Sequence, residues 1–570
     1  MVKRIIKKVF GIIVTAIYTT SLITTPTMAE DNKIINSSFK NWLDGWNVKG
    51  DVNAATGKDN WGYDDSYSLG YWNDTDYEVW TEQTITGIEN GYYRVEAYAA
   101  SGGNQEAHYL YANDFGGTGA RTSIPITNEF TKVVLNFEVT NNSVTIGFYS
   151  KGRAATWSNY DCISLVKTDE EYKFLKGGDL TMVNYIEDLG GRFYDSEGEE
   201  RDVFHILAES GFNFARLRTH NDTGREHGSV TNPNYYLPDG YQNTEDLLKS
   251  ARRAKEVGME IEVTLNYSDW WPNGATQEIP SSWRKEIEGL ENDAAVDKLE
   301  ELVYEYTKEV MQKLVDQGTT PEYISLGNEM QYGILYPYGR VSNFEQLARF
   351  LNAGYRAVKE ISTNTKVVLH LDEAGEDNRY TTFLDGCIEN NVNYDIIGAS
   401  YYPFWTKKNV EDIIPWFNEL SQKYNKKILI METGYNWNPT KPNGWPGQLS
   451  DNGNESHESS PQGQKEFLDE LFNGIRNAEN NCIIGDLYWD PVMIAYDGVG
   501  WAMERGEAED GSEDKAGDNV VSNTTLFDFD GKALPSLNSF RDNTEGTTKG
   551  IISGIVTGEN GNKIVGAEVV

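Results

Sequence analysis

Three acidic side chains follow apolar segments that have the composition of β-strands. Glu329 follows Leu326-Gly327-Asn328, Glu432 follows Leu429-Ile430-Met431, and Asp372 follows Leu369-His370-Leu371. A carboxylate at such a position costs free energy to bury unless it is paired or used. Cleavage of a glycosidic bond needs two carboxyl groups, one as acid and one as nucleophile or base. The sequence therefore predicts Glu329 and Glu432 as a catalytic pair. The alternative for either glutamate alone is a structural ion pair with a basic residue.

The region 177–543 alternates strand-like apolar runs with amphipathic helical patterns, which predicts a (β/α)₈ barrel. The predicted strands are Asp179–Val183, Phe214–Arg218, Glu260–Tyr267, Tyr323–Glu329, Lys366–Asp372, Tyr394–Tyr402, Lys427–Thr433 and Cys482–Trp489, and the clearest helices are Thr244–Gly258, Asp293–Gln317, Asn343–Ile361 and Val410–Tyr424. The alternative is an open, doubly wound sheet. No glycine-rich phosphate loop follows the first strand, which weakens that alternative. In a barrel, the ends of strands four and seven would bring Glu329 and Glu432 to one mouth.

Residues 30–167 predict an all-β sandwich, because short alternating segments are separated by Gly and Asn turns. Tyr92–Tyr98, Lys132–Val139 and Ser143–Tyr149 are examples of these strands. This region carries six Trp and eleven Tyr, more than a small core requires. Aromatic rings at a surface can stack on sugars. We expect about half of these rings to serve packing and a minority to contact a ligand.

The remaining segments predict export and further modules. Residues 1–29 combine a basic start, an apolar stretch and Thr27-Met28-Ala29, which is typical of a signal peptide and of a secreted protein. The alternative is an uncleaved membrane anchor. Residues 168–176 form a charged linker, and 544–570 predict the truncated start of an immunoglobulin-like β module, whose missing part could associate with a cell wall.

The charge balance and the cysteines restrict the possible partners. The formal charge of −38 disfavours binding to nucleic acid or anionic membranes. The three cysteines, Cys162, Cys387 and Cys482, are widely spaced, so we expect buried free thiols and no disulfide framework. No histidine pair has metal-ligand spacing, so no catalytic metal or other cofactor for catalysis is expected.

The barrel region resembles glycoside hydrolase family 53, the endo-β-1,4-galactanases, within a large clan of retaining glycosidases. The motifs that carry the resemblance are Phe214-Ala215-Arg216-Leu217-Arg218, Leu265-Asn266-Tyr267-Ser268-Asp269-Trp270-Trp271, Leu326-Gly327-Asn328-Glu329-Met330, Ser400-Tyr401-Tyr402-Pro403-Phe404-Trp405, Glu432-Thr433-Gly434-Tyr435 and the segment 526–536. They run through the whole barrel in order. The resemblance implies that Glu329 is the acid/base, that Glu432 is the nucleophile, and that Asn328 binds the sugar 2-hydroxyl.

Further substrate-binding residues are expected at other strand ends. Arg218 would orient and ionise Glu432, and either Tyr401 or Tyr402 would hydrogen-bond that nucleophile. Trp489 would form the floor under the sugar at the cleavage point, with a core role as its alternative. Other subsites would be lined by Trp270, Trp271, Trp405 and Trp437. His370 is as well explained by a structural role as by ligand contact.

The sandwich region resembles carbohydrate-binding module family 61, which binds galactan. The matching segments are 90–98, 109–112, 146–150 and 160–166. The two resemblances together predict hydrolysis of β-1,4-galactan in arabinogalactan or pectin. The alternatives are another retaining β-1,4-glycanase of the clan, such as a mannanase or xylanase, and a polysaccharide-binding protein with an inactive barrel.

One departure from the family concerns a structural calcium. Bacterial family members often bind calcium between the loops after strands seven and eight, through an Asp-x-Asp-x-His-x-Asn arrangement. Residues 438–445 do not reproduce that arrangement, although Asp451, Asn454, Glu455 and His457 lie nearby in sequence. In the loop after strand eight, Ser522 occupies a position where an acidic residue would help to bind calcium. A structural calcium is therefore possible, without assigned ligands.

Overall fold

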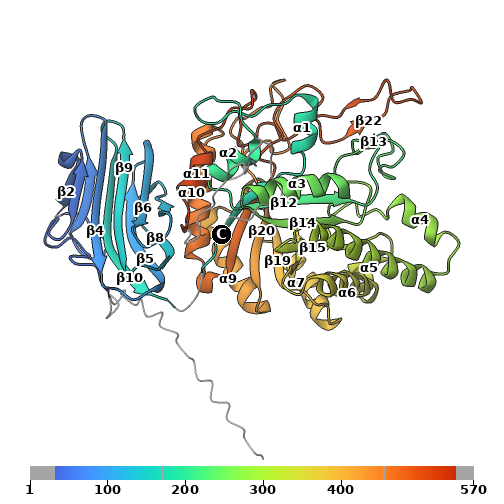
Figure 1. Cartoon of the computed structure of the whole chain (residues 1–570), viewed down its shortest axis with the longest axis horizontal. Helices are drawn as coiled ribbons and strands as arrows, with labels where there is room; N and C mark the ends of the chain where they lie inside the picture. The colour runs from blue at the N-terminus through green and yellow to red at the C-terminus, as the bar shows by residue number, and fades with distance from the viewer. Residues whose placement is uncertain (1–31, 59, 169–171, 453–455, 547–570) are drawn as a thin grey trace, which may run out of the picture.

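The computed structural model describes residues 32–546, apart from residues 59, 169–171 and 453–455. An all-β sandwich precedes a barrel, and Figure 1 shows the two side by side with α10 and α11 between them. The predicted signal peptide and the predicted immunoglobulin-like strands lie outside the described residues. Within the described part, no helix has both the length and the apolar character needed to cross a membrane.

The sandwich consists of two five-stranded antiparallel sheets with the strand orders β1-β4-β9-β6-β7 and β2-β3-β10-β5-β8. Its strands are β1 (Asn47–Gly50), β2 (Ala55–Lys58), β3 (Ser68–Trp72), β4 (Tyr77–Thr86), β5 (Gly91–Ser101), β6 (Gln105–Asn113), β7 (Ala120–Ser123), β8 (Thr127–Val139), β9 (Ser143–Gly152) and β10 (Trp157–Lys167). The alternating burial along β4 and β5 shows the period of two that the sequence predicts. The inward-facing residues form a core of their own, separate from that of the barrel.

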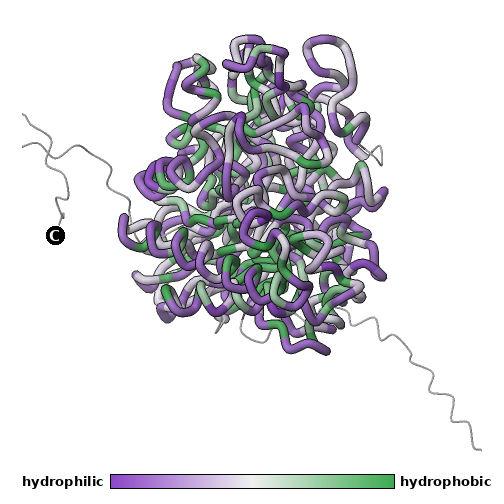
Figure 2. The backbone as a smooth tube through the Cα atoms, turned by 90° about the vertical axis from the view of Figure 1, so that its right-hand side faces the viewer, coloured by the Kyte–Doolittle hydropathy of each residue, from purple (hydrophilic) through white to green (hydrophobic). Residues whose placement is uncertain are grey.

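Eight parallel strands close into the barrel, as predicted, in the order β11-β12-β14-β15-β18-β19-β20-β21. They are β11 (Leu175–Asp179), β12 (Phe214–His220), β14 (Glu260–Asn266), β15 (Tyr323–Ser325), β18 (Lys366–Leu371), β19 (Ile396–Tyr401), β20 (Lys427–Thr433) and β21 (Ile483–Tyr488). Pairing of β11 with β21 completes the closure. Hydrophobic backbone segments gather in the interior of this part, with hydrophilic segments around them (Figure 2).

Helices on the outside connect consecutive barrel strands. The long ones are α3 (Thr244–Glu256), α5 (Asn292–Asp316), α6 (Phe344–Ile361), α7 (Asp377–Glu389), α9 (Val410–Tyr424) and α10 (Pro461–Asn477), and the short ones are α1 (Val183–Leu189), α2 (Val203–Glu209), α4 (Ser281–Ile287), α8 (Pro403–Thr406) and α11 (Leu537–Arg541). The Asn243 side chain caps α3 by accepting from the backbone of Asp246. Two-residue strands in the loops are β13 (Tyr235–Tyr236), β16 (Gly333–Ile334), β17 (Gly339–Arg340), β22 (Met503–Glu504) and β23 (Lys515–Ala516).

Two predicted strands differ from the observed ones by more than two residues at one or both ends. The first strand was predicted at Asp179–Val183, which is wrong: β11 ends at Asp179, and Val183 begins α1. The apolar residues after Asp179 led to the wrong strand bounds. The observed strand contains Gly177, a residue that is uncommon in strands, because a Cβ atom there would lie 1.7 Å from the Phe214 carbonyl oxygen. The fourth strand was predicted to reach Glu329, but β15 stops at Ser325. Positive φ angles at Gly327 and Glu329 turn the chain out of the strand.

A buried arginine joins the sandwich to the barrel. Arg476, on α10, is fully buried and donates to Thr122 of β7 at 2.8 Å, to the Arg121 carbonyl at 3.3 Å, and to Asn543. It also forms an ion pair with Glu545 at 2.6 Å. Backbone hydrogen bonds in both directions between Arg121 and Thr544 continue the contact. The two parts therefore share a hydrogen-bonded interface.

We predict that Arg476→Met lowers the free energy of unfolding by about 3 kcal/mol, because it leaves the partly buried Glu545 carboxylate and several buried acceptors without their donor. The midpoint of urea denaturation measures this change. Arg356→Met is the matched control, since Arg356 is 55% exposed in its ion pair with Glu300, and it should cost less than about 1 kcal/mol. Equal midpoints for the two variants would contradict the structural role of Arg476.

Candidate active site

Glu432 is the last residue but one of the seventh barrel strand, β20, and is held by two donors. Arg216 of β12 donates to one carboxyl oxygen at 2.6 Å, and the Tyr402 hydroxyl donates to the other at 3.0 Å. The second terminal nitrogen of Arg216 donates to the Asn328 side-chain oxygen at 2.5 Å. One guanidinium therefore fixes both Glu432 and the residue before Glu329. These donors stabilise negative charge on Glu432.

Arg216 is fully buried, and its charge is balanced inside the barrel. Besides Glu432, Asp179 and Glu262 each lie 3.8 Å from its guanidinium. Burial raises the pKa of Glu262 to about 8, with Arg216 opposing that rise. A buried arginine without such acids would carry a large desolvation cost.

Glu329 lies beyond β15, in a turn that projects its side chain toward Glu432. Its backbone has a φ of +46°, a conformation that costs free energy for a non-glycine residue and is found most often at functional sites. The Ser400 hydroxyl donates to the Glu329 carboxyl group at 2.9 Å, and the His370 ring contacts that hydroxyl at 2.8 Å. The side chain is thus positioned from β18 and β19.

The two glutamates approach one another closely. One carboxyl oxygen of each lies within 4.8 Å of the other, with a ring nitrogen of His370 at similar range. Burial raises the pKa of Glu329 well above its usual value, and the negative charges of Glu432 and Asp372 add to the rise. Burial and the nearby Arg216 and Arg218 lower the pKa of His370, so this ring is neutral. The site therefore pairs a protonated glutamate with a charge-stabilised one.

An open cleft of about 750 Å³ surrounds the pair. Trp271, Trp489 and Trp501 supply aromatic surface to it, together with Arg218, Asn328 and Asp372. The indole nitrogen of Trp489 has no hydrogen-bond partner among the described residues. The Arg218 guanidinium lies 4.2 Å from the Trp271 ring centroid and holds this ring in place. The cleft thus combines stacking surfaces with polar groups, as sugar sites require.

Two expectations at the site need correction. Arg218 was expected to orient Glu432, but its partner is Asp179 at 2.7 Å, and Arg216 contacts the glutamate instead. Tyr401 is fully buried and donates to the Lys408 carbonyl at 3.0 Å, outside the cleft, so it does not bind substrate. Tyr402 is the tyrosine that contacts Glu432.

The tryptophans expected at the subsites also divide into those that line the cleft and one that is buried outside it. The cleft includes Trp270, Trp271, Trp405 and Trp489, as expected. Trp437 is wrong as a subsite residue, because it is buried against Phe529 with ring centroids 4.5 Å apart. Sequence reasoning missed Trp501, which lies in the long loop after β21 and has no strand end to mark it.

The loops after β20 and β21 are joined by an ion pair between Lys441 and Asp518. Lys441 is buried, so a cation of the chain itself already occupies this junction. Nearby, His457 contacts Glu470 at 2.7 Å, and the two glutamates beside it raise its pKa to about 9 despite burial. A protonated imidazole is no metal ligand. These described residues do not fit a calcium site; Asn454 and Glu455 lie outside the described residues.

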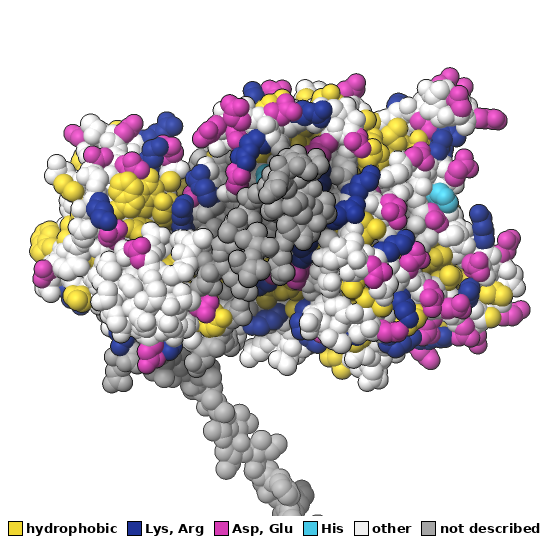
Figure 3. Space-filling model, viewed as in Figure 1, with side chains coloured by type: hydrophobic (Ala, Val, Ile, Leu, Met, Phe, Trp, Pro, Cys, Tyr) yellow, Lys and Arg dark blue, Asp and Glu magenta, His cyan; other side chains and the backbone are white. Residues whose placement is uncertain are grey.

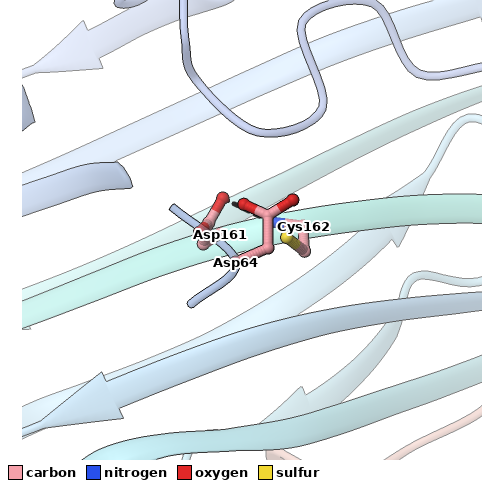
Figure 4. A group of neighbouring side chains, drawn as sticks. All are labelled: Asp64, Asp161 and Cys162. Atoms are coloured by element: carbon pink, nitrogen blue, oxygen red, sulfur yellow. Dashed lines mark hydrogen bonds between the residues drawn. The ribbon is translucent and has the colours of Figure 1, made fainter. Parts of the chain in front are cut away.

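A separate group of acidic and thiol side chains lies in the sandwich. Figure 4 shows Asp64, Asp161 and Cys162 close together, and their ligand atoms lie within 4.8 Å of one another. The Asp161 carboxylate accepts from the backbone of Tyr63 and of Cys162, both at 2.7 Å. Burial raises the pKa of the Cys162 thiol, which is therefore uncharged. This group ties the loop around Tyr63 to β10. All three cysteines are buried and free, as predicted.

Comparisons with known proteins agree with this geometry. Residues 175–540 match the model of "Glycosyl hydrolase family 53". A protein of Bacillus subtilis (strain 168) named "Endo-beta-1,4-galactanase" is 29% identical over 389 residues, covering 65% of this chain and 85% of that protein. "Arabinogalactan endo-beta-1,4-galactanase A" of Emericella nidulans is 28% identical, covering 60% of this chain and 91% of that protein.

A solved structure shares the barrel. The "Ignisphaera aggregans GH53 catalytic domain" is 31% identical with a TM-score of 0.57, and the match covers 66% of this chain and 97% of that one. The fold, the glutamate pair and the family model lead to one conclusion. This chain belongs to glycosyl hydrolase family 53.

Proposed function

We propose that the protein is an endo-β-1,4-galactanase that hydrolyses β-1,4-galactosidic bonds with retention of configuration. The observation that carries this proposal is the separation of the glutamates. Retaining glycosidases hold their carboxyl groups about 5 Å apart, whereas inverting enzymes need about 6.5–9.5 Å to admit a water molecule. Oxygens within 4.8 Å therefore favour retention. The names of the relatives support galactan as the substrate.

The mechanism follows from the protonation of the pair. Glu329 begins protonated and gives its proton to the leaving glycosidic oxygen, while Glu432 attacks the anomeric carbon to form a covalent glycosyl-enzyme. Glu329, now ionised, then removes a proton from water, which attacks the same carbon and releases Glu432. Asn328, fixed by Arg216, lies where it can hydrogen-bond the sugar. Trp489 offers a ring for stacking beneath it.

Glu329→Gln and Glu432→Gln test these roles. Each should lower kcat on purified β-1,4-galactan by about 10³-fold or more, because each removes a group that forms or breaks bonds in the transition state. Reducing-sugar release measures this effect, and proton NMR of wild-type products should show the β-anomer first. Turnover of mannan or xylan, together with no turnover of galactan, would refute the substrate assignment. An initial α-anomer would refute retention.

The pH dependence tests the acid role of Glu329. Activity requires the protonated form, so kcat/KM should fall as pH rises through its raised pKa. Asp372→Asn removes a nearby negative charge, so the pKa of Glu329 falls. The alkaline limb of the kcat/KM profile should then move to lower pH by about 0.5–1 unit. Ser400→Ala removes a donor to the carboxylate, so the limb should move to higher pH. Shifts of the same sign in both variants would count against the assignment.

The sandwich is proposed to bind the same polysaccharide. On the β1-β4-β9-β6-β7 sheet, the Trp80 and Tyr109 rings each lie 4.8 Å from Tyr149. Trp80 and Tyr109 line a cavity of about 350 Å³ together with polar side chains such as Glu82 and Asn113. Rings with polar groups at their rim are the usual elements of a saccharide site.

Trp80→Ala should weaken binding to insoluble galactan by about tenfold, because stacking of an aromatic ring on a sugar contributes on the order of 1 kcal/mol or more. A pull-down isotherm measures this loss. Trp42→Ala is the control, since Trp42 is 53% exposed on the same module but does not line the cavity. Equal weakening by both substitutions would contradict the proposed face. Export from the cell and association with a cell wall stay predictions from the sequence.

A further inference from the structure

A second cavity, of about 760 Å³, adjoins the active-site cleft. Ala275 and Thr276 line both spaces, and Val230 and Thr231 of the second cavity directly precede Asn232 of the cleft. Its other walls come from α4 and from the hairpin that contains β17. A chain bound in the cleft therefore has a continuous path into this cavity.

Three cations line the second cavity: Arg284, Lys285 and Arg340. Within the described residues, none of them lies within ion-pair distance of a carboxylate, whereas Arg349, on the neighbouring helix α6, pairs with both Asp297 and Glu300. Acidic and basic side chains intermingle over the face of the molecule in Figure 3, and the formal charge is −38. Among the described residues, these three cations are therefore left without a carboxylate partner and remain available to a bound anion.

Two of the three cations, Arg340 and Arg284, have contacts that restrict their motion. The Arg340 guanidinium lies 3.6 Å from the centroid of the Tyr336 ring, which restricts its motion. Arg284 donates to the Ile279 carbonyl oxygen, which leaves its other nitrogens available. An arginine that is oriented before binding loses less entropy when it binds a carboxylate.

The cavity has two acidic residues, Glu278 and Glu288, against three cations, and among the described residues neither acid forms an ion pair with them. Both Glu278 oxygens accept hydrogen bonds from the loop 229–231, at 2.6–3.0 Å. Glu288 is exposed at the end of α4. The cavity thus presents positive charge toward the space that continues from the cleft.

The wall of the cavity is tied directly to the reacting residues. The Gln277 side chain lines it and donates to the Asn328 carbonyl oxygen at 2.8 Å. Asn328 precedes Glu329, so this wall and the acid are fixed to one another.

We propose that this cavity is a subsite for a carboxylate-bearing sugar unit, a uronate, on the same polysaccharide whose neutral chain occupies the cleft. The inference rests on the proposed function and extends it to the substrate class. The guanidinium groups of Arg284 and Arg340 would bind the carboxylate and Lys285 would add charge, while Tyr336 and Tyr338 flank the sugar ring.

The test uses one polymer in two charge states. The acidic form is β-1,4-galactan in which some primary hydroxyls have been oxidised to carboxylates, and the neutral form is the same material after the carboxyls are reduced back. For wild-type protein, kcat/KM on the acidic form should exceed that on the neutral form about threefold or more in 20 mM NaCl. Because salt screens the attraction, the ratio should approach one in 500 mM NaCl. The protein's overall negative charge acts in the opposite direction.

Lys285→Gln/Arg340→Gln should bring the ratio to one or below. The matched control is Arg252→Gln/Lys366→Gln, which removes the same charge from α3 and from the start of β18, outside both cavities; it should keep the wild-type ratio. A wild-type ratio at or below one, or a ratio equally lowered in both double variants, overturns the proposal.

Failure of the proposed function is separable from failure of this inference. Inactivity of the wild type on both polymers would contradict the galactanase assignment. The affinities for the two polymers are then measured by isothermal titration calorimetry, which needs no turnover. A stronger affinity for the acidic form, lost in Lys285→Gln/Arg340→Gln, supports the subsite, and equal affinities refute it.

Discussion

The buried guanidinium of Arg216 is the interaction on which the site depends. It contacts Glu432 and Asn328 at once, and so it connects the strand that carries one glutamate to the turn that carries the other. Desolvation of this cation is tolerated because Glu432 and Asp179 lie nearby inside the barrel. Without a fixed positive charge at this point, two carboxyl groups within 4.8 Å would repel when both are ionised.

That charge distribution produces the difference between the glutamates. Glu432 has an arginine and a phenol as donors, whereas Glu329 has one serine hydroxyl, and its burial together with the charges of Glu432 and Asp372 outweighs the opposing charge of Arg216. Environments that differ in this way give two chemically identical side chains different roles. The left-handed backbone at Glu329 belongs to the same arrangement, because it directs the side chain of a residue beyond the strand end into the mouth of the barrel.

The sequence allowed the barrel, the sandwich and the glutamate pair to be predicted, because periodicity and strand-end position are local properties. It could not separate Arg216 from Arg218, since residues two apart on a strand face the same side and only depth distinguishes them. Tyr401 and Tyr402 were separable only by the structure, because β19 ends between them. Trp501 was missed for a related reason: a residue in a long loop has no periodic signal, and its approach to the cleft depends on tertiary packing.

The junction around Arg476 has a consequence for how the cleft and the proposed sugar-binding face of the sandwich would work together. A flexible tether would let a binding module search a large volume around its enzyme, but a hydrogen-bonded junction holds it in one orientation. Simultaneous engagement then increases avidity only for material whose strands are spaced and directed to match. Under the proposed function, the fixed junction would favour a polysaccharide whose packing lets one strand reach the cleft while another reaches the sandwich.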